Sequence, residues 1–295
     1  MNPFDFVSTY HKLAVHDPKL GISFTGGIWM YVSGSTGGKE VRNGEYNAVM
    51  SAIAVRLKLG GPSAVPATFY LNDPQIDPTE PFYQPGIRRA YAGRGSADEI
   101  RDATRLAVLT KRCKPYEAKT YMEGWFGQDC NSFAGNYQGI SPNHSIRAWA
   151  KGYKDNENIS GATNDVYVTE GLLPLPVVTD PAQITTGTII ITDSAEKQFR
   201  HIAVVNSYVP ITTGSKPSGT LEVAEWGQAG KDESAHARKA EKVDLLYTET
   251  PGMGKTKVWA FKDGTGKKHF RFFLDASKLD SLPCRGWHVG NQDGV

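Results

Sequence analysis

A cysteine at the start of a predicted helix is the feature of this sequence best suited to chemistry. Cys130 stands in the stretch GQDCNSFAGNYQGIS, directly after Asp129, a residue type that caps helix N-termini. Phe133, Ala134 and Tyr137 follow at the spacing of one helical stripe, which predicts that the thiol faces a sheet. The unpaired N–H groups and the positive end of the helix dipole favour a thiolate there. Cys130 is therefore a candidate nucleophile that needs a base.

His201 is the histidine placed best to be that base. It begins the predicted strand RHIAVVNSY (residues 200–208), and the next predicted strand is TLEVAEW (residues 220–226). If the two strands pair antiparallel around a loop centred near residue 213, position 201 lies opposite about position 225. Glu225 then shares a face with His201, and its carboxylate can accept the imidazole N–H and stabilise the imidazolium. Cys130, His201 and Glu225 thus form a candidate nucleophile, base and orienting group.

Each of these residues also has a structural interpretation. A cysteine on an apolar helical stripe is often a small core residue, and a lone strand histidine or glutamate usually has no catalytic role. His144 is a rival base, but it follows Cys130 by only 14 residues. Glu222 is predicted on the face opposite to Glu225 and fits the orienting role less well. The order of the three groups along the chain favours the catalytic interpretation.

The flanking sequence predicts an α+β fold that would position these groups. Helices are expected over residues 45–59 and 97–112, the second with a capping box formed by Ser96 and Glu99. After Cys130 the pattern changes to about five antiparallel strands. These strands are expected over residues 186–192, 200–208, 220–226, 256–263 and 267–275. We expect the cysteine helix to pack on this sheet.

Two regions are expected along the chain. Residues 1–95 form an N-terminal region of unassigned role, which contains a proline-rich stretch, residues 62–88, expected as an extended loop or covering arm. Residues 96–290 form the domain that carries the candidate site. The start of the chain lacks the pattern of a secretory signal, and the sequence has no apolar run of membrane-spanning length.

Composition excludes several classes of function. The net charge of +2 and a pI near 8.3 do not indicate a nucleic-acid binder, but they would tolerate an anionic polymer such as cell-wall glycan. The three cysteines cannot all pair, and no cysteine or histidine cluster has metal-ligand spacing. Cys113 and Cys284 are expected as buried thiols or as a pair. No metal or cofactor is predicted.

Three motifs in order give the chain a family resemblance. The segments DCNSFAGNY, TTGTIIITD with RHIAVVNSY, and LEVAEWG resemble the cysteine helix, strand pair and polar-residue strand of papain-like NlpC-type and CHAP amidohydrolases. The resemblance covers roughly Tyr121 to Trp226. It departs from the pattern at Asn131-Ser132-Phe133, where many relatives carry Ser-Gly-Phe, and at Thr188, where they carry an acidic residue.

The resemblance implies roles for particular residues. Cys130 would be the nucleophile, His201 the general base and Glu225 the orienting group of a papain-like fold. Tyr121, or else Tyr116, would help to hold the oxyanion, alongside the backbone N–H of Cys130. The implied reaction is metal-free cleavage of amide bonds in peptidoglycan stem peptides or cross-links.

A wall substrate combined with no visible signal suggests an antibacterial effector. Such a protein would be delivered by a secretion machine to the periplasm of a target bacterium and would require an immunity protein. Two alternatives stay open. One is a papain-like protease, deamidase or acyltransferase acting on a protein, and the other is a non-catalytic wall-binding module.

Overall fold

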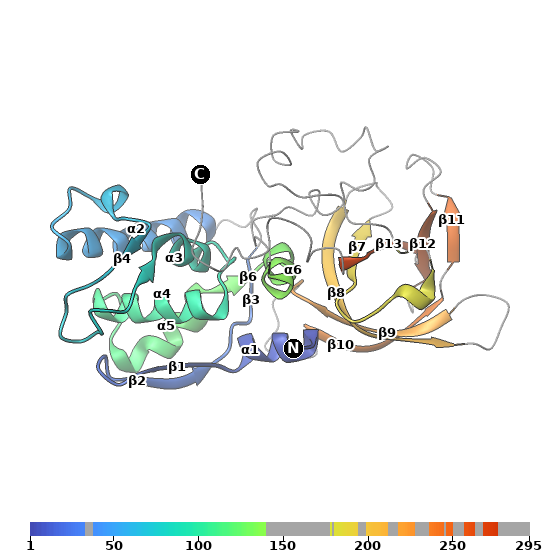
Figure 1. Cartoon of the computed structure of the whole chain (residues 1–295), viewed down its shortest axis with the longest axis horizontal. Helices are drawn as coiled ribbons and strands as arrows, with labels where there is room; N and C mark the ends of the chain where they lie inside the picture. The colour runs from blue at the N-terminus through green and yellow to red at the C-terminus, as the bar shows by residue number, and fades with distance from the viewer. Residues whose placement is uncertain are drawn as a thin grey trace. The chain divides into compact units, whose positions relative to one another are not determined.

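The chain folds into two compact units, shown in Figure 1. The computed structural model describes residues 1–32, 38–139, 178, 180–193, 199–211, 218–227, 236–244, 246–249, 257–262 and 268–276. The N-terminal unit is Ser8–Asp129, and the C-terminal unit combines Met1–Val7 with the described residues from Cys130 onward. Helices and an antiparallel sheet make the fold α+β, as the sequence predicts.

The N-terminal unit is mainly helical, with short strand pairs. α1 (Pro3–His11) contributes residues to both units. The other elements of the N-terminal unit are β1 (Leu13–Asp17), β2 (Ile22–Gly26), β3 (Met30–Tyr31), α2 (Gly38–Arg56), η1 (Pro62–Ala64), β4 (Thr68–Phe69), β5 (Phe82–Tyr83), α3 (Gln84–Tyr91), α4 (Ala97–Leu109), η2 (Pro115–Glu117), α5 (Ala118–Trp125) and β6 (Gly127–Gln128).

α4 follows its sequence prediction closely. The Ser96 side chain accepts from the backbone N–H of Glu99, and the Glu99 carboxylate accepts from the backbone N–H of Ser96. Its predicted apolar stripe is fully buried and consists of Ile100, Ala103, Leu106 and Ala107. Substitution of such a capping serine by alanine typically lowers the free energy of unfolding by about 1 kcal/mol. This local interaction therefore favours a helix start at Ala97.

The proline-rich stretch is more structured than expected. It contains the η1 turn and the antiparallel β4–β5 pair, and it runs into α3. The prediction of loop through residue 88 is therefore wrong at its end. Pro85 lies in the first turn of α3, where a missing N–H breaks no helical hydrogen bond, so proline is compatible with the helix there.

The C-terminal unit holds one seven-stranded sheet. The strands lie in the order β10-β9-β8-β7-β13-β12-β11, and all neighbouring pairs are antiparallel. The described elements of this unit are α6 (Cys130–Gln138), η4 (Pro181–Gln183), β7 (Ile189–Asp193), β8 (Phe199–Ile211), β9 (Ser218–Glu225), β10 (Ala237–Asp244), β11 (Leu246–Glu249), β12 (Lys257–Lys262) and β13 (Lys268–Leu274). The five expected strands are present, and β10 and β11 are additional.

An apolar core holds the centre of this sheet together. Residues from β7, β8, β9 and β13 share one cluster with side chains from the segment before β7. Its buried members are Val178, Ile184, Ile190, Ala203, Val205, Leu221, Val223 and Phe273. Burial of each such side chain contributes about 1.5–3 kcal/mol for the larger aliphatic and aromatic groups, which makes β8 and β9 a rigid platform.

The division between the units differs from the expected boundary at residues 95 and 96. α4 packs on α3, α5 and β1, and β3 pairs in parallel with β6, with Met30 opposite Gly127. These contacts hold residues 96–129 in the N-terminal unit, so the division falls between Asp129 and Cys130. Met1–Val7 belong to the C-terminal unit, although more than a hundred residues separate them from Cys130 in the sequence.

Candidate active site

The predicted nucleophile is the first residue of α6. The helix begins at Cys130, as the sequence predicts, and packs against β8 and β9 (Figure 1). Phe133 and Ala134, one turn later, are fully buried, whereas Tyr137 is only partly buried. Because the thiol sits at the N-terminal end of the helix, it lies next to backbone N–H groups that have no helical acceptor.

A row of aromatic rings fixes α6 against the sheet. The Phe133 ring lies 5.6 Å from the ring of Phe6 and 5.8 Å from that of Trp226, measured between centroids. Trp226 in turn stacks on His236, with centroids 4.0 Å apart and planes 8° apart. Trp226 is therefore a core residue that follows Glu225 directly. The row connects α6, the helix of the predicted nucleophile, to the strand of the predicted orienting carboxylate.

His201 and Glu225 are brought together as predicted, but through a different register. Ala203, not His201, lies opposite Glu225, and a bulge interrupts the β8–β9 pairing between Val205 and Ser207. The shift amounts to two residues, which keeps His201 and Glu225 on the same face because side chains alternate along a strand. The His201 Nε2 and Glu225 Oε2 atoms lie 2.8 Å apart.

The imidazole also bonds the thiol, and the two partners set its charge. Burial alone would lower the pKa of His201, but hydrogen bonds to Cys130 and Glu225 and the negative charge of both raise that pKa to about 9. Since Nε2 faces Glu225, Nδ1 is the ring nitrogen left for Cys130. At neutral pH the imidazole is thus an imidazolium held between a carboxylate and the thiol, an arrangement suited to nucleophilic attack and proton transfer.

Loss of the Glu225 charge should move the pH dependence of this pair. In a Glu225→Gln variant the imidazolium loses its carboxylate, so the pKa of His201 falls and the alkaline limb of kcat/KM moves to lower pH, by about 1 to 3 pH units. The matched control is Glu222→Gln, because Glu222 accepts instead from Asn206 and Ser207. A pH–rate profile that is unchanged in Glu225→Gln would contradict the orienting role.

Tyr121 is engaged within the N-terminal unit. Its hydroxyl donates to Glu45 Oε1 at 2.8 Å and lies 2.6 Å from the hydroxyl of Tyr91. Arg112 pairs with both oxygens of Glu45, at 2.9 and 2.7 Å. Burial, together with Tyr91 and Glu45, raises the pKa of Tyr121 and keeps it protonated. The Tyr121 hydroxyl thus already serves a buried network, and Tyr116 is exposed, so the contacts of neither tyrosine indicate an oxyanion role.

Thiol reactivity separates Cys130 from Cys113. Burial, and then the charges of Glu117 and Glu45, raise the pKa of Cys113 to about 12, whereas Cys130 lies beside an imidazolium. At pH 6 we expect iodoacetamide to modify Cys130 and to leave Cys113 intact. Accessibility alone predicts the reverse order, because Cys113 is 9% exposed and Cys130 only 3%.

The labelling is read by peptide mass spectrometry in a Cys284→Ser background, since Cys284 lies outside the described residues. Preferential modification of Cys113 would mean that exposure, not the imidazolium, controls reactivity. The rival base His144 also lies outside the described residues.

Three contributors to this site have no counterpart among the predicted residues. Phe6 precedes its partner Phe133 by more than a hundred residues, and no local pattern connects them. His236 stands outside the predicted strands. Gly227 lies against the His201 ring, and the motif LEVAEWG contains the signal for it, since this glycine follows Glu225 by two residues.

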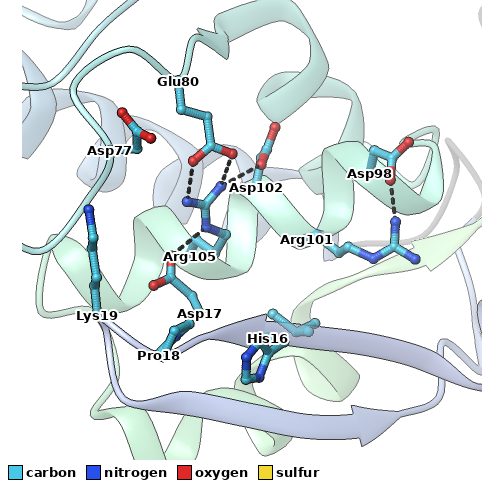
Figure 2. A pocket seen from close by; sticks show the side chains of 11 residues that line it. His16, Asp17, Pro18, Lys19, Asp77, Glu80, Asp98, Arg101, Asp102 and Arg105 are labelled. Atoms are coloured by element: carbon cyan, nitrogen blue, oxygen red, sulfur yellow. Dashed lines mark hydrogen bonds and ion pairs between the residues drawn. The ribbon is translucent and has the colours of Figure 1, made fainter.

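A cavity in the N-terminal unit is lined by charged residues (Figure 2). This cavity of about 560 Å3 is organised around Arg105 on α4. The Arg105 guanidinium binds both carboxylate oxygens of Glu80 at 2.7 Å and Asp17 at 2.8 Å, and Asp102 lies 3.3 Å away. These ion pairs tie the proline-rich stretch and β1 to α4, so the charges are paired with one another. The ion pair between Arg105 and Glu80 thus fixes the proline-rich stretch to α4.

No three His, Cys, Asp or Glu side chains are grouped to hold a metal ion within the part of the chain that the structure describes. None of the described helices is both long and apolar enough to cross a membrane. No protein-family model, curated protein or solved structure matches this chain.

Proposed function

We propose that this protein is a papain-like cysteine hydrolase that cleaves amide bonds of peptidoglycan. The observation that carries the proposal is the bonded set of Cys130, His201 and Glu225, contributed by a helix start and two neighbouring strands. The order of the three groups along the chain, and the motifs around them, support the resemblance to NlpC-type and CHAP amidohydrolases. That resemblance supplies the substrate class.

The reaction begins with attack of the Cys130 thiolate on an amide carbonyl carbon, which forms a C–S bond and a tetrahedral oxyanion. The backbone N–H at the start of α6 stabilises this oxyanion, and one such donor contributes about 3 to 4 kcal/mol. His201 gives its proton to the amine nitrogen as the C–N bond breaks, leaving a thioester on Cys130.

Hydrolysis of the thioester completes the cycle. His201, now neutral, takes a proton from water as the water oxygen attacks the thioester carbon. The C–S bond then breaks, which releases the carboxylic acid and restores the thiolate beside the imidazolium. Glu225 holds the ring orientation through both steps and stabilises each imidazolium state.

We further propose that the protein acts as an antibacterial effector in the periplasm of a target cell, with an immunity protein as its neutralising partner. Expression directed to the periplasm should lyse bacteria, whereas cytoplasmic expression should not, because the substrate lies outside the inner membrane. Growth and cell shape are measured for the wild type and for Cys130→Ala in both compartments. Harm caused only from the cytoplasm would overturn this proposal and favour a protein substrate.

A further inference from the structure

Gly227 lies against the Cε1 carbon of the His201 ring. Nε2 faces Glu225, Nδ1 is left for Cys130, and Cε1 is the carbon between these two nitrogens. A Cβ built on Gly227 would lie 3.1 Å from Cε1, 3.5 Å from Nε2 and 3.9 Å from Nδ1. The ring is thus bounded on three sides.

The backbone does not explain why this residue is glycine. Gly187, by contrast, has φ +89°, a conformation that side chains rarely adopt, whereas Gly227 lies outside that region. Space is the remaining constraint, since a contact of 3.1 Å is tighter than nearly all real Cβ contacts. Gly227 follows the end of β9 by two residues, and glycine is the usual residue where the backbone must come close to another group.

We infer that Gly227 is a positioning residue that lets the His201 imidazole reach Cys130 and Glu225 at the same time. A methyl group at position 227 would displace the ring by a few tenths of an ångström. Movement away from Gly227 lengthens the hydrogen bonds to the thiol and the carboxylate, which hold the ring in place for proton transfer. The inference rests on the proposed catalytic role of the pair, but not on the identity of the substrate.

The test compares Gly227→Ala with Gly219→Ala, a control within β9, the strand that ends two residues before Gly227. A Cβ on Gly219 would meet the Tyr208 ring at 2.4 Å, a more severe clash that does not involve His201. We expect Gly227→Ala to lower kcat about 10- to 100-fold with little change in KM, because small misplacements of a catalytic group are costly. The alkaline limb of the pH–rate profile of Gly227→Ala should move to lower pH, because the hydrogen bond between His201 and Glu225 weakens. The pH–rate profile of Gly219→Ala should have its alkaline limb at the same pH as that of the wild type.

The same variants are also compared without substrate. NMR measures the titration of the His201 imidazole, and alkylation measures how the reactivity of Cys130 depends on pH. They separate failure of this inference from failure of the proposed function. A shifted titration with no activity on peptidoglycan would support the inference and reject the substrate. Wild-type turnover and titration in Gly227→Ala would overturn the inference.

A double-mutant cycle covers the case in which Gly227→Ala is unstable. Unfolding free energies are measured for the wild type, Gly227→Ala, His201→Ala and the double variant. We expect the alanine at position 227 to destabilise the protein less once His201 is removed. Equal destabilisation in both backgrounds, or unfolding of both Gly227→Ala and the double variant, would show that Gly227 does not act through His201 and would overturn the inference.

Discussion

Replacement of Cys130 by alanine should reduce amide hydrolysis by about 10⁴-fold or more, because the proposed mechanism forms the thioester on the Cys130 sulfur. The change removes one buried sulfur at the start of α6 and leaves Phe133 and the aromatic row in place. The variant should therefore unfold at nearly the same temperature as the wild type. Activity is measured as the rate at which purified peptidoglycan suspensions clear. Clearing at the wild-type rate by folded Cys130→Ala would exclude Cys130 as the nucleophile.

His201→Ala should lower kcat/KM by about 10³- to 10⁴-fold, because in the proposed mechanism the ring serves both proton-transfer steps. It should also abolish the rapid alkylation of Cys130 at pH 6, since the imidazolium that favours the thiolate is gone. Both quantities are measured on the same preparation, with thermal unfolding as the control for the fold. Retained alkylation at pH 6 would show that the thiol is activated by something other than His201.

Local signals account for the parts of the structure that the sequence predicted well. The capping box of Ser96 and Glu99 fixes the start of α4, and the start of α6 at Cys130 follows from its residue order. The pairing of His201 with Glu225 survived an error of two residues in register, because a two-residue shift preserves the face of a strand. An error of one residue would have separated them.

Long-range contacts account for what the sequence did not reveal. The bulge between Val205 and Ser207 changes the register of β8 and β9, and no turn motif announces it. The division at Asp129 depends on the packing of α4 within the N-terminal unit. Phe6, near the start of the chain, contacts Phe133 on α6. Such contacts join residues whose local sequence carries no sign of the partner.

The Cys130–His201–Glu225 arrangement has a further consequence for how its parts respond to substitution. The three groups share one imidazole, so their effects on turnover should be far from additive. Once Cys130 is alanine, replacing His201 or Glu225 as well should lower the residual rate only slightly. The neighbouring carboxylate Glu222, which binds Asn206 and Ser207, should behave independently of this set.

The central claim is that Cys130 cleaves an amide bond of peptidoglycan. Digestion of purified peptidoglycan by the wild type and by Cys130→Ala, followed by mass spectrometry of the released muropeptides, tests it most directly. We predict new fragments, each ending at a hydrolysed amide bond, from the wild type alone. Identical muropeptide profiles from the two proteins, under conditions where Cys130 is rapidly alkylated at pH 6, would contradict the claim and direct the search to a protein substrate.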